Sequence, residues 1–89
     1  MNSAHNPLYI EFVAKLRQAR KAKGLTQGDL GFILRQPQAF ISKVETCERR
    51  LDLVEAAEWC IALDVGFLDV LPERLRQKME AASKKGRKS

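Results

Sequence analysis

Apolar residues recur at helical spacing along most of this chain, and no stretch alternates in the manner of a β-strand. In the first such stretch, Leu8, Phe12, Leu16 and Ala19 follow one another at steps of four, four and three residues, so they share one side of a helix. A chain of 89 residues is too short to bury two independent cores. The sequence therefore predicts a single all-α domain.

Prolines, glycines and capping residues divide this pattern into helices. Pro7 suits a first turn, Gly24 a stop, and Thr26 an N-cap with Asp29 three positions later. A glycine at position 31 of so short a helix indicates that the next helix passes close by. The expected helices cover 7–23, 27–34, 37 or 38–45, about 52–63, 65–71 and 72–82. Their expected inward residues include Leu30, Leu34, Ile41, Val44, Leu53, Ala56 or Ala57, Cys60 and Leu63, with Trp59 beside them.

Several classes of function are disfavoured by composition. No apolar run approaches the roughly 18 residues of a membrane span, and residues 1–7 do not resemble a secretory signal, so we expect a cytoplasmic protein without membrane contact. Cys47, Cys60 and a single histidine, His5, supply neither a disulfide framework nor a metal quartet. Since no nucleophile has a plausible base near it in sequence, we expect no enzyme activity, cofactor or metal.

Charge is distributed unevenly along the chain. Residues 15–50 hold nine basic and three acidic residues, whereas residues 51–72 hold five acidic residues and no lysine or arginine. A basic face attracts a polyanion, so we expect one in the first of these segments. Residues 73–89 are again basic, and this tail either aids solubility or contacts nucleic acid. Residues 83–89 are expected to be disordered.

Two short helices joined by a three-residue break form a helix-turn-helix arrangement. The segments that carry a closer resemblance are Leu25-Thr26-Gln27, Leu30 and Leu34, the run 37–45 (PQAFISKVE) and the run 48–52 (ERRLD). In this order and spacing they resemble the phage repressor/Cro (XRE-type) helix-turn-helix DNA-binding family, over roughly residues 8–71. The resemblance implies a compact five-helix bundle of the lambda-repressor type, followed by a short C-terminal helix and a basic tail. The implied organisation is a flexible leader (1–6), a DNA-binding domain (7–71), a helix (72–82) and a disordered tail (83–89).

The chain departs from the family in two loops. The family commonly has glycine where this chain has Arg35 and an aliphatic residue where it has Gln36. A non-glycine residue in a left-handed conformation costs about 1 kcal/mol, so we expect the turn to follow another backbone path. Cys47 replaces the glycine that usually follows the recognition helix; it is either a tolerated loop residue or a redox switch.

The resemblance places helix 38–45 in the major groove of DNA. Gln38 can pair bidentately with adenine, Lys43 can reach guanine or a phosphate, Ala39 can pack on a thymine methyl, and Ser42 is adaptable. An ordinary solvated face is the alternative for these polar residues. Phe40 either belongs to the core or leans on the nucleic acid.

The resemblance implies further roles outside this helix. Gln27 would bind phosphate and brace Gln38, while Arg49 and Arg50 would reach the adjacent backbone or minor groove. In some family members the positions of Arg20 and Glu45 form a half-buried salt bridge, which would join the first helix to the third.

The expected partner is double-stranded DNA with a palindromic operator, bound by a homodimer, because a single module of this size buries little surface. The residues weighed as a dimer surface are Phe67, Leu68, Val70, Leu71, Leu75 and Met79. In the alternative interpretation, Phe67, Leu68 and Leu71 close the monomer core. The leading functional hypothesis is a transcriptional repressor. The alternatives are an antitoxin that also binds a toxin partner, and a protein-interaction adaptor of the same fold.

Overall fold

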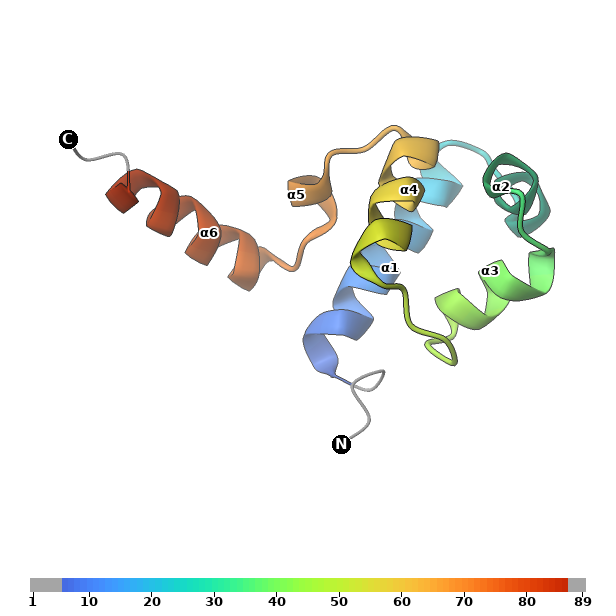
Figure 1. Ribbon diagram of the computed structural model, residues 1–89, viewed down its shortest axis with the longest axis horizontal. Coiled ribbons are helices and arrows are strands. Elements are labelled where there is room, and N and C mark those ends of the chain that lie inside the picture. Colours follow the sequence, from blue (N-terminus) through green and yellow to red (C-terminus); the bar gives the residue numbers. More distant parts are fainter. Residues whose placement is uncertain (1–5, 87–89) are drawn as a thin grey trace.

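The computed structural model describes residues 6–86, and every regular element in this range is a helix (Figure 1). Apart from Asn6, the expected leader lies outside the described residues. The helices are α1 (Pro7–Ala22), α2 (Gln27–Leu34), α3 (Gln38–Glu45), α4 (Leu53–Leu63), α5 (Phe67–Val70) and α6 (Glu73–Gly86). The prediction of an all-α fold is confirmed, and the bounds of α2 and α3 agree with the expected ones.

Side-chain caps explain where three of these helices begin. The Asn6 side chain accepts a hydrogen bond from the Leu8 amide (2.8 Å), next to the proline that opens α1. Thr26 and Asp29 form a reciprocal capping box at the start of α2, with bonds of 3.0 and 2.9 Å. Asp52 forms the same motif with Glu55 at the start of α4. These bonds satisfy amide groups that have no partner within the helix.

The core lies between α1 on one side and α3, α4 and α5 on the other, and α2 packs against α3 and α4. Its largest fully buried side chain is Trp59 of α4. The other fully buried side chains of these helices are Val13 and Leu16 of α1, Leu30 of α2, Ile41 and Val44 of α3, and Leu63 of α4. This packing holds α2 and α3 as one unit at one end of the molecule.

The prediction that Leu53 faces inward is wrong, because this side chain is 76% exposed. The buried side of α4 is formed by Ala56, Trp59, Cys60 and Leu63. Since the large Trp59 indole occupies the space between α4 and the rest of the bundle, the helix turns Leu53 toward solvent.

The turn between α2 and α3 keeps a left-handed residue although it lacks the expected glycine. Arg35 adopts φ 58° and ψ 42°, so the expectation of another backbone path is wrong. The Gln36 amide donates to the Gly31 carbonyl at 2.8 Å, which closes the end of α2. The conformational cost of one left-handed arginine is modest. It is offset by the packing energy between α2 and α3, which this turn holds together.

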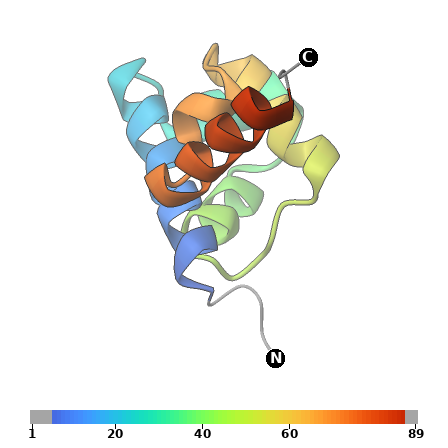
Figure 2. The same cartoon turned by 90° about the vertical axis from the view of Figure 1, so that its left-hand side faces the viewer.

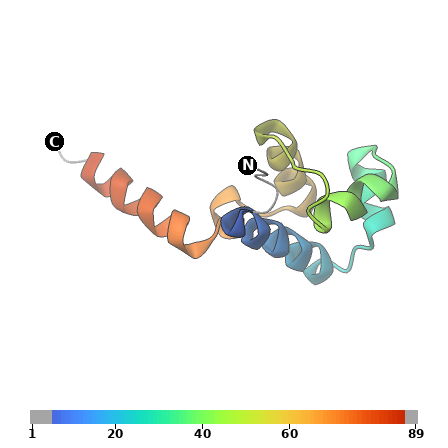
Figure 3. The ribbon, with the colours of Figure 1, turned by 90° about the horizontal axis from the view of Figure 1, so that it is seen from below.

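The chain continues as a helix beyond the expected limit at residue 82. While 87–89 lie outside the described range and the expected disorder of the tail stays a prediction, α6 extends to Gly86. The reason is local, since lysines favour helices and suit a helix C-terminus, and no breaker intervenes before Gly86. Figures 1 and 3 place α6 and α3 at opposite ends of the molecule, and Figure 2 is seen from the α6 end.

The short helix α5 and the residue after it pack against α1 and close the core on that side. Val70 and Leu71 are buried within the monomer, so their side chains are not accessible to a second copy. Phe67 and Leu68 remain about 40% exposed, and the Phe67 ring also meets Phe12 edge to face at 6.1 Å. Leu75 is half-buried at the start of α6, whereas Met79 is half exposed.

Candidate nucleic-acid interface

Helix α3 has one apolar side and one polar side, and only the apolar side is covered. Ile41 and Val44 are fully buried in the core. Gln38, Ala39 and Lys43 are exposed on the opposite side, and Ser42 is half-buried beside them. The expected reading residues therefore lie together on an open surface.

The polar side of α3 is also chemically available. Within residues 6–86, no hydrogen bond or ion pair engages the side chains of Gln38, Ser42 or Lys43, although many other polar side chains are paired. The helix is about 12 Å long at 1.5 Å per residue, and a rod of this width fits the major groove of B-form DNA. A ligand that meets this side finds free donors and acceptors on a rigid support.

The position of α3 is fixed by a buried ion pair with α1. Arg20 Nε donates to Glu45 Oε2 at 2.7 Å, and a second guanidinium nitrogen donates to Oε1 at 3.0 Å. The two side chains are 7% and 2% exposed. Arg20 also donates to the Leu25 carbonyl at 2.7 Å, so one guanidinium joins α1, the loop before α2 and the end of α3. Such bidentate, charge-assisted bonds are geometrically specific.

Gln27 takes part in this network and not in the expected pair with Gln38. Its side-chain amide donates to Glu45 Oε1 at 3.0 Å. Among the described residues, no hydrogen bond joins Gln27 to Gln38, and the bracing role implied by the resemblance stays a prediction. Gln27 remains at the start of α2, where the helix N-terminus favours a phosphate.

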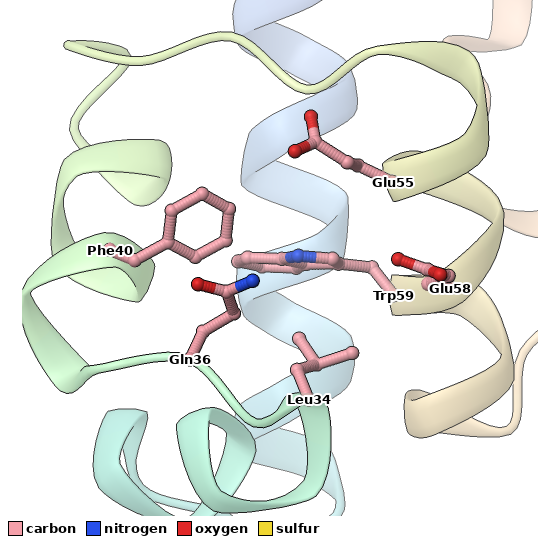
Figure 4. A pocket seen from close by; sticks show the side chains of 6 residues that line it. All are labelled: Leu34, Gln36, Phe40, Glu55, Glu58 and Trp59. Carbon is pink, nitrogen blue, oxygen red and sulfur yellow. The ribbon is translucent and has the colours of Figure 1, made fainter.

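Phe40 faces the bundle and not the open side of α3. Figure 4 shows its ring pointing toward the indole of Trp59, across a small pocket that Leu34 and Gln36 also line. The side chain is half-buried against the core. Of the two interpretations of Phe40, the structure supports packing against the core.

The Arg49 side chain is held between Phe40 of α3 and Glu55 of α4. Two of its nitrogens donate to the two carboxylate oxygens of Glu55, at 3.0 and 2.9 Å, and a further bond reaches the Arg50 carbonyl. The guanidinium carbon lies 4.7 Å from the centre of the Phe40 ring. The hydrogen bonds from Arg49 lower the pKa of the Glu55 carboxyl, and those to Glu55 raise the pKa of Arg49. Arg49 thus supports the loop after α3, which leaves Arg50 as the more available cation.

Arg50 lies over the ring of Tyr9, 4.7 Å from its centre. The Tyr9 hydroxyl accepts a hydrogen bond from the Leu51 amide at 3.0 Å, and burial raises the pKa of this phenol. The first helix therefore fixes the loop that carries Arg50, and it does so through a side chain that remains protonated at neutral pH.

Arg17 and Lys21 are two exposed cations of α1 that the sequence motifs did not single out. With Gln18, they line a shallow groove between α1 and the end of α3, which Glu45 and Cys47 also border. Arg17 Nε lies 3.8 Å from Glu45 Oε1, and its side chain is 54% exposed. Their spacing of four residues, on the side of the helix away from the apolar stripe, is a signal that would have identified them.

Cys47 occupies the loop directly after α3, with φ 63°. Burial raises the pKa of its thiol, which lowers the share of the reactive thiolate. This favours the interpretation of Cys47 as a tolerated loop residue.

Over residues 6–86, no helix combines the length and the apolar character that crossing a bilayer requires.

Comparison with known proteins places this arrangement in context. The crystal structure of the restriction-modification controller protein C.AhdI from Aeromonas hydrophila matches the chain with a TM-score of 0.65 and 30% sequence identity. The match covers 71% of this chain and 96% of that protein. No protein-family model and no curated protein sequence matches the chain.

Proposed function

Because the chain belongs to the phage repressor/Cro (XRE-type) helix-turn-helix family, we propose that it is a sequence-specific DNA-binding transcription regulator. One observation carries the proposal: the polar side of α3 is open and its side chains have no partner among the described residues, whereas the opposite side of the same helix is buried in the core. A helix with this division is suited to enter the major groove without unfolding or repacking.

Each exposed side chain of α3 has a defined task in this proposal. Gln38 presents an amide that pairs with the N6 and N7 positions of adenine. Ala39 packs on a thymine methyl, and Ser42 donates to or accepts from an adjacent base. Lys43, farther along the helix, binds a phosphate or the O6 and N7 atoms of guanine. Gln27, Arg17, Lys21 and Arg50 surround this helix and bind the sugar–phosphate backbone.

The regulator acts as a dimer in this proposal. A single module of this kind buries about 600–1,000 Å² on DNA, which gives limited affinity. Two copies related by a two-fold axis read two half-sites about 34 Å apart, so the operator is a palindrome. A dimer bound there represses by occupying the DNA, and genes of restriction–modification type are the first candidates in view of the likeness to C.AhdI.

The replacement Gln38→Ala tests base reading by α3. It should weaken binding to the preferred duplex by about 1–3 kcal/mol, because the bidentate contact to one adenine is lost. Binding to a duplex of scrambled sequence should change little. Fluorescence anisotropy titrations on both duplexes measure the difference, and Gln77→Ala, an exposed glutamine on α6, serves as the matched control. An equal loss on both duplexes would show that Gln38 does not read a base.

The replacement Lys43→Ala tests whether this lysine neutralises a phosphate. Each such contact contributes about 0.9 to the slope of log affinity against log salt concentration. We therefore expect the variant to bind more weakly at low salt and to show a slope smaller by about one. Arg74→Ala, an exposed cation on α6, should leave the slope unchanged. If Lys43→Ala binds as tightly as the wild type at every salt concentration, Lys43 does not belong to the interface.

A further inference from the structure

The outer side of α4 carries an apolar stripe that the monomer leaves uncovered. Its members are Leu53, Val54, Ala57 and Ile61. Three of them are large and far from buried, since Leu53 is 76%, Val54 65% and Ile61 78% exposed. Positions 53, 57 and 61 follow one another at steps of four, so the residues form one surface along the helix. Contiguous exposed apolar surfaces of this kind mark sites of association.

A second uncovered apolar stripe lies on α6, formed by Leu75, Met79 and Ala82. Leu75 is half-buried, Met79 is 50% exposed and Ala82 is exposed. Figures 1 and 3 show α6 running away from the bundle, so this helix does not fold back over the α4 stripe of its own chain. An isolated helix of this length is marginal in water, and packing of its apolar side against another surface stabilises it.

The two stripes match in length and differ in the charge beside them. At 1.5 Å per residue, each extends over about 10–12 Å. Glu58 flanks the α4 stripe, within a segment, 51–72, that has five carboxylates and no lysine or arginine. Lys78 flanks the α6 stripe, and within residues 6–86 it forms no ion pair. Placing α4 against α4 would bring two acidic segments together, whereas placing α6 on α4 joins opposite charges.

We propose that two copies of this chain dimerise by exchange, with α6 of each copy lying across the α4 stripe of the other. The arrangement covers both apolar stripes twice and brings Lys78 toward Glu58. The reading residues of α3 belong to neither stripe. The inference rests on the proposed dimer and names its surface, but it does not depend on DNA recognition.

Two full-length variants and their mixture test this exchange, with mass measured by sedimentation equilibrium in the absence of DNA. Ile61→Asp damages the α4 stripe and leaves α6 intact, while Met79→Asp damages α6 and leaves the α4 stripe intact. Each variant alone has a charge in both contacts of the dimer, so we expect the dissociation constant to rise by at least about 100-fold. Both residues are at least half exposed in the monomer, so helix content by circular dichroism should be unchanged.

The mass of the equimolar mixture of the two variants is the decisive measurement. An Ile61→Asp chain and a Met79→Asp chain together have one undamaged contact, α6 of the first on α4 of the second, so the mixture should dimerise more tightly than either variant alone. Ala81→Asp, which adds the same charge on the other side of α6, should dimerise like the wild type. A monomeric wild type, a single variant that dimerises normally, or a mixture that stays monomeric would overturn the exchange. DNA binding by the wild type, measured separately, would stand in each case.

Discussion

Replacing Glu45 by alanine should lower the free energy of unfolding by about 3–5 kcal/mol, because it leaves the Arg20 guanidinium buried without its counter-charge. Arg20 and Glu45 are among the least exposed charged side chains, and two bonds of 2.7 and 3.0 Å join them. The change also removes the acceptor of the Gln27 amide. Urea unfolding followed by circular dichroism measures the loss.

Two further variants show how much of this loss comes from the burial of the Arg20–Glu45 pair and how much from the unpaired charge. Lys23→Ala removes an exposed pair with Asp64, at 3.5 Å, and should cost less than about 1 kcal/mol. The double replacement of Arg20 and Glu45 by methionine leaves no unpaired charge, so it should be much less harmful than Glu45→Ala. If Glu45→Ala costs no more than Lys23→Ala, the pair does not hold α3 in place.

Replacing Gly31 by alanine should destabilise the protein by about 2 kcal/mol, since the added carbon forces the backbone of the turn to move. A Cβ atom built at position 31 lies 2.6 Å from the Gln36 carbonyl oxygen and 3.6 Å from the Gln38 amide nitrogen. The Gln36 oxygen belongs to the main chain and cannot swing aside. The displaced turn should also reposition α3 and weaken DNA binding.

Gly28 of the same helix provides the control. A Cβ atom there would meet nothing closer than the Thr26 hydroxyl, at 3.7 Å. Gly28→Ala should therefore stabilise the protein, by up to about 1 kcal/mol, through the better helix propensity of alanine. Thermal unfolding of the two variants should give shifts of opposite sign. A Gly31→Ala protein as stable as the wild type would show that α2 and α3 are less closely packed than the structure indicates.

Local chemistry explains why most of the fold was predictable. Thr26 with Asp29, Asp52 and Pro7 mark helix starts through hydrogen bonds that depend on neighbours in sequence. The close approach at Gly31 was also expected, because a glycine in a short helix needs a steric reason. Its contact turned out to be the turn itself together with α3.

Features that depend on the path of distant segments were predicted less well. Leu53 was assigned to the core because its spacing alone did not show how far Trp59 turns α4. The hydrogen bonds from Gln27 to Glu45 and from Arg49 to Glu55 were not predicted, because the positions of these acceptors follow from tertiary packing. The side of α3 that faces solvent was predicted correctly, because the spacing of Ile41 and Val44 shows which side is buried.

Selection of bound duplexes from a random pool, made in parallel with the wild type and Gln38→Ala, tests the central claim most directly. The account predicts that the wild type enriches an inverted repeat with half-site centres about 34 Å apart. It also predicts that the variant loses its preference at one symmetry-related pair of positions and keeps the rest. A wild-type pool without any enriched sequence, or identical motifs from the two proteins, would contradict recognition of DNA by the exposed side of α3.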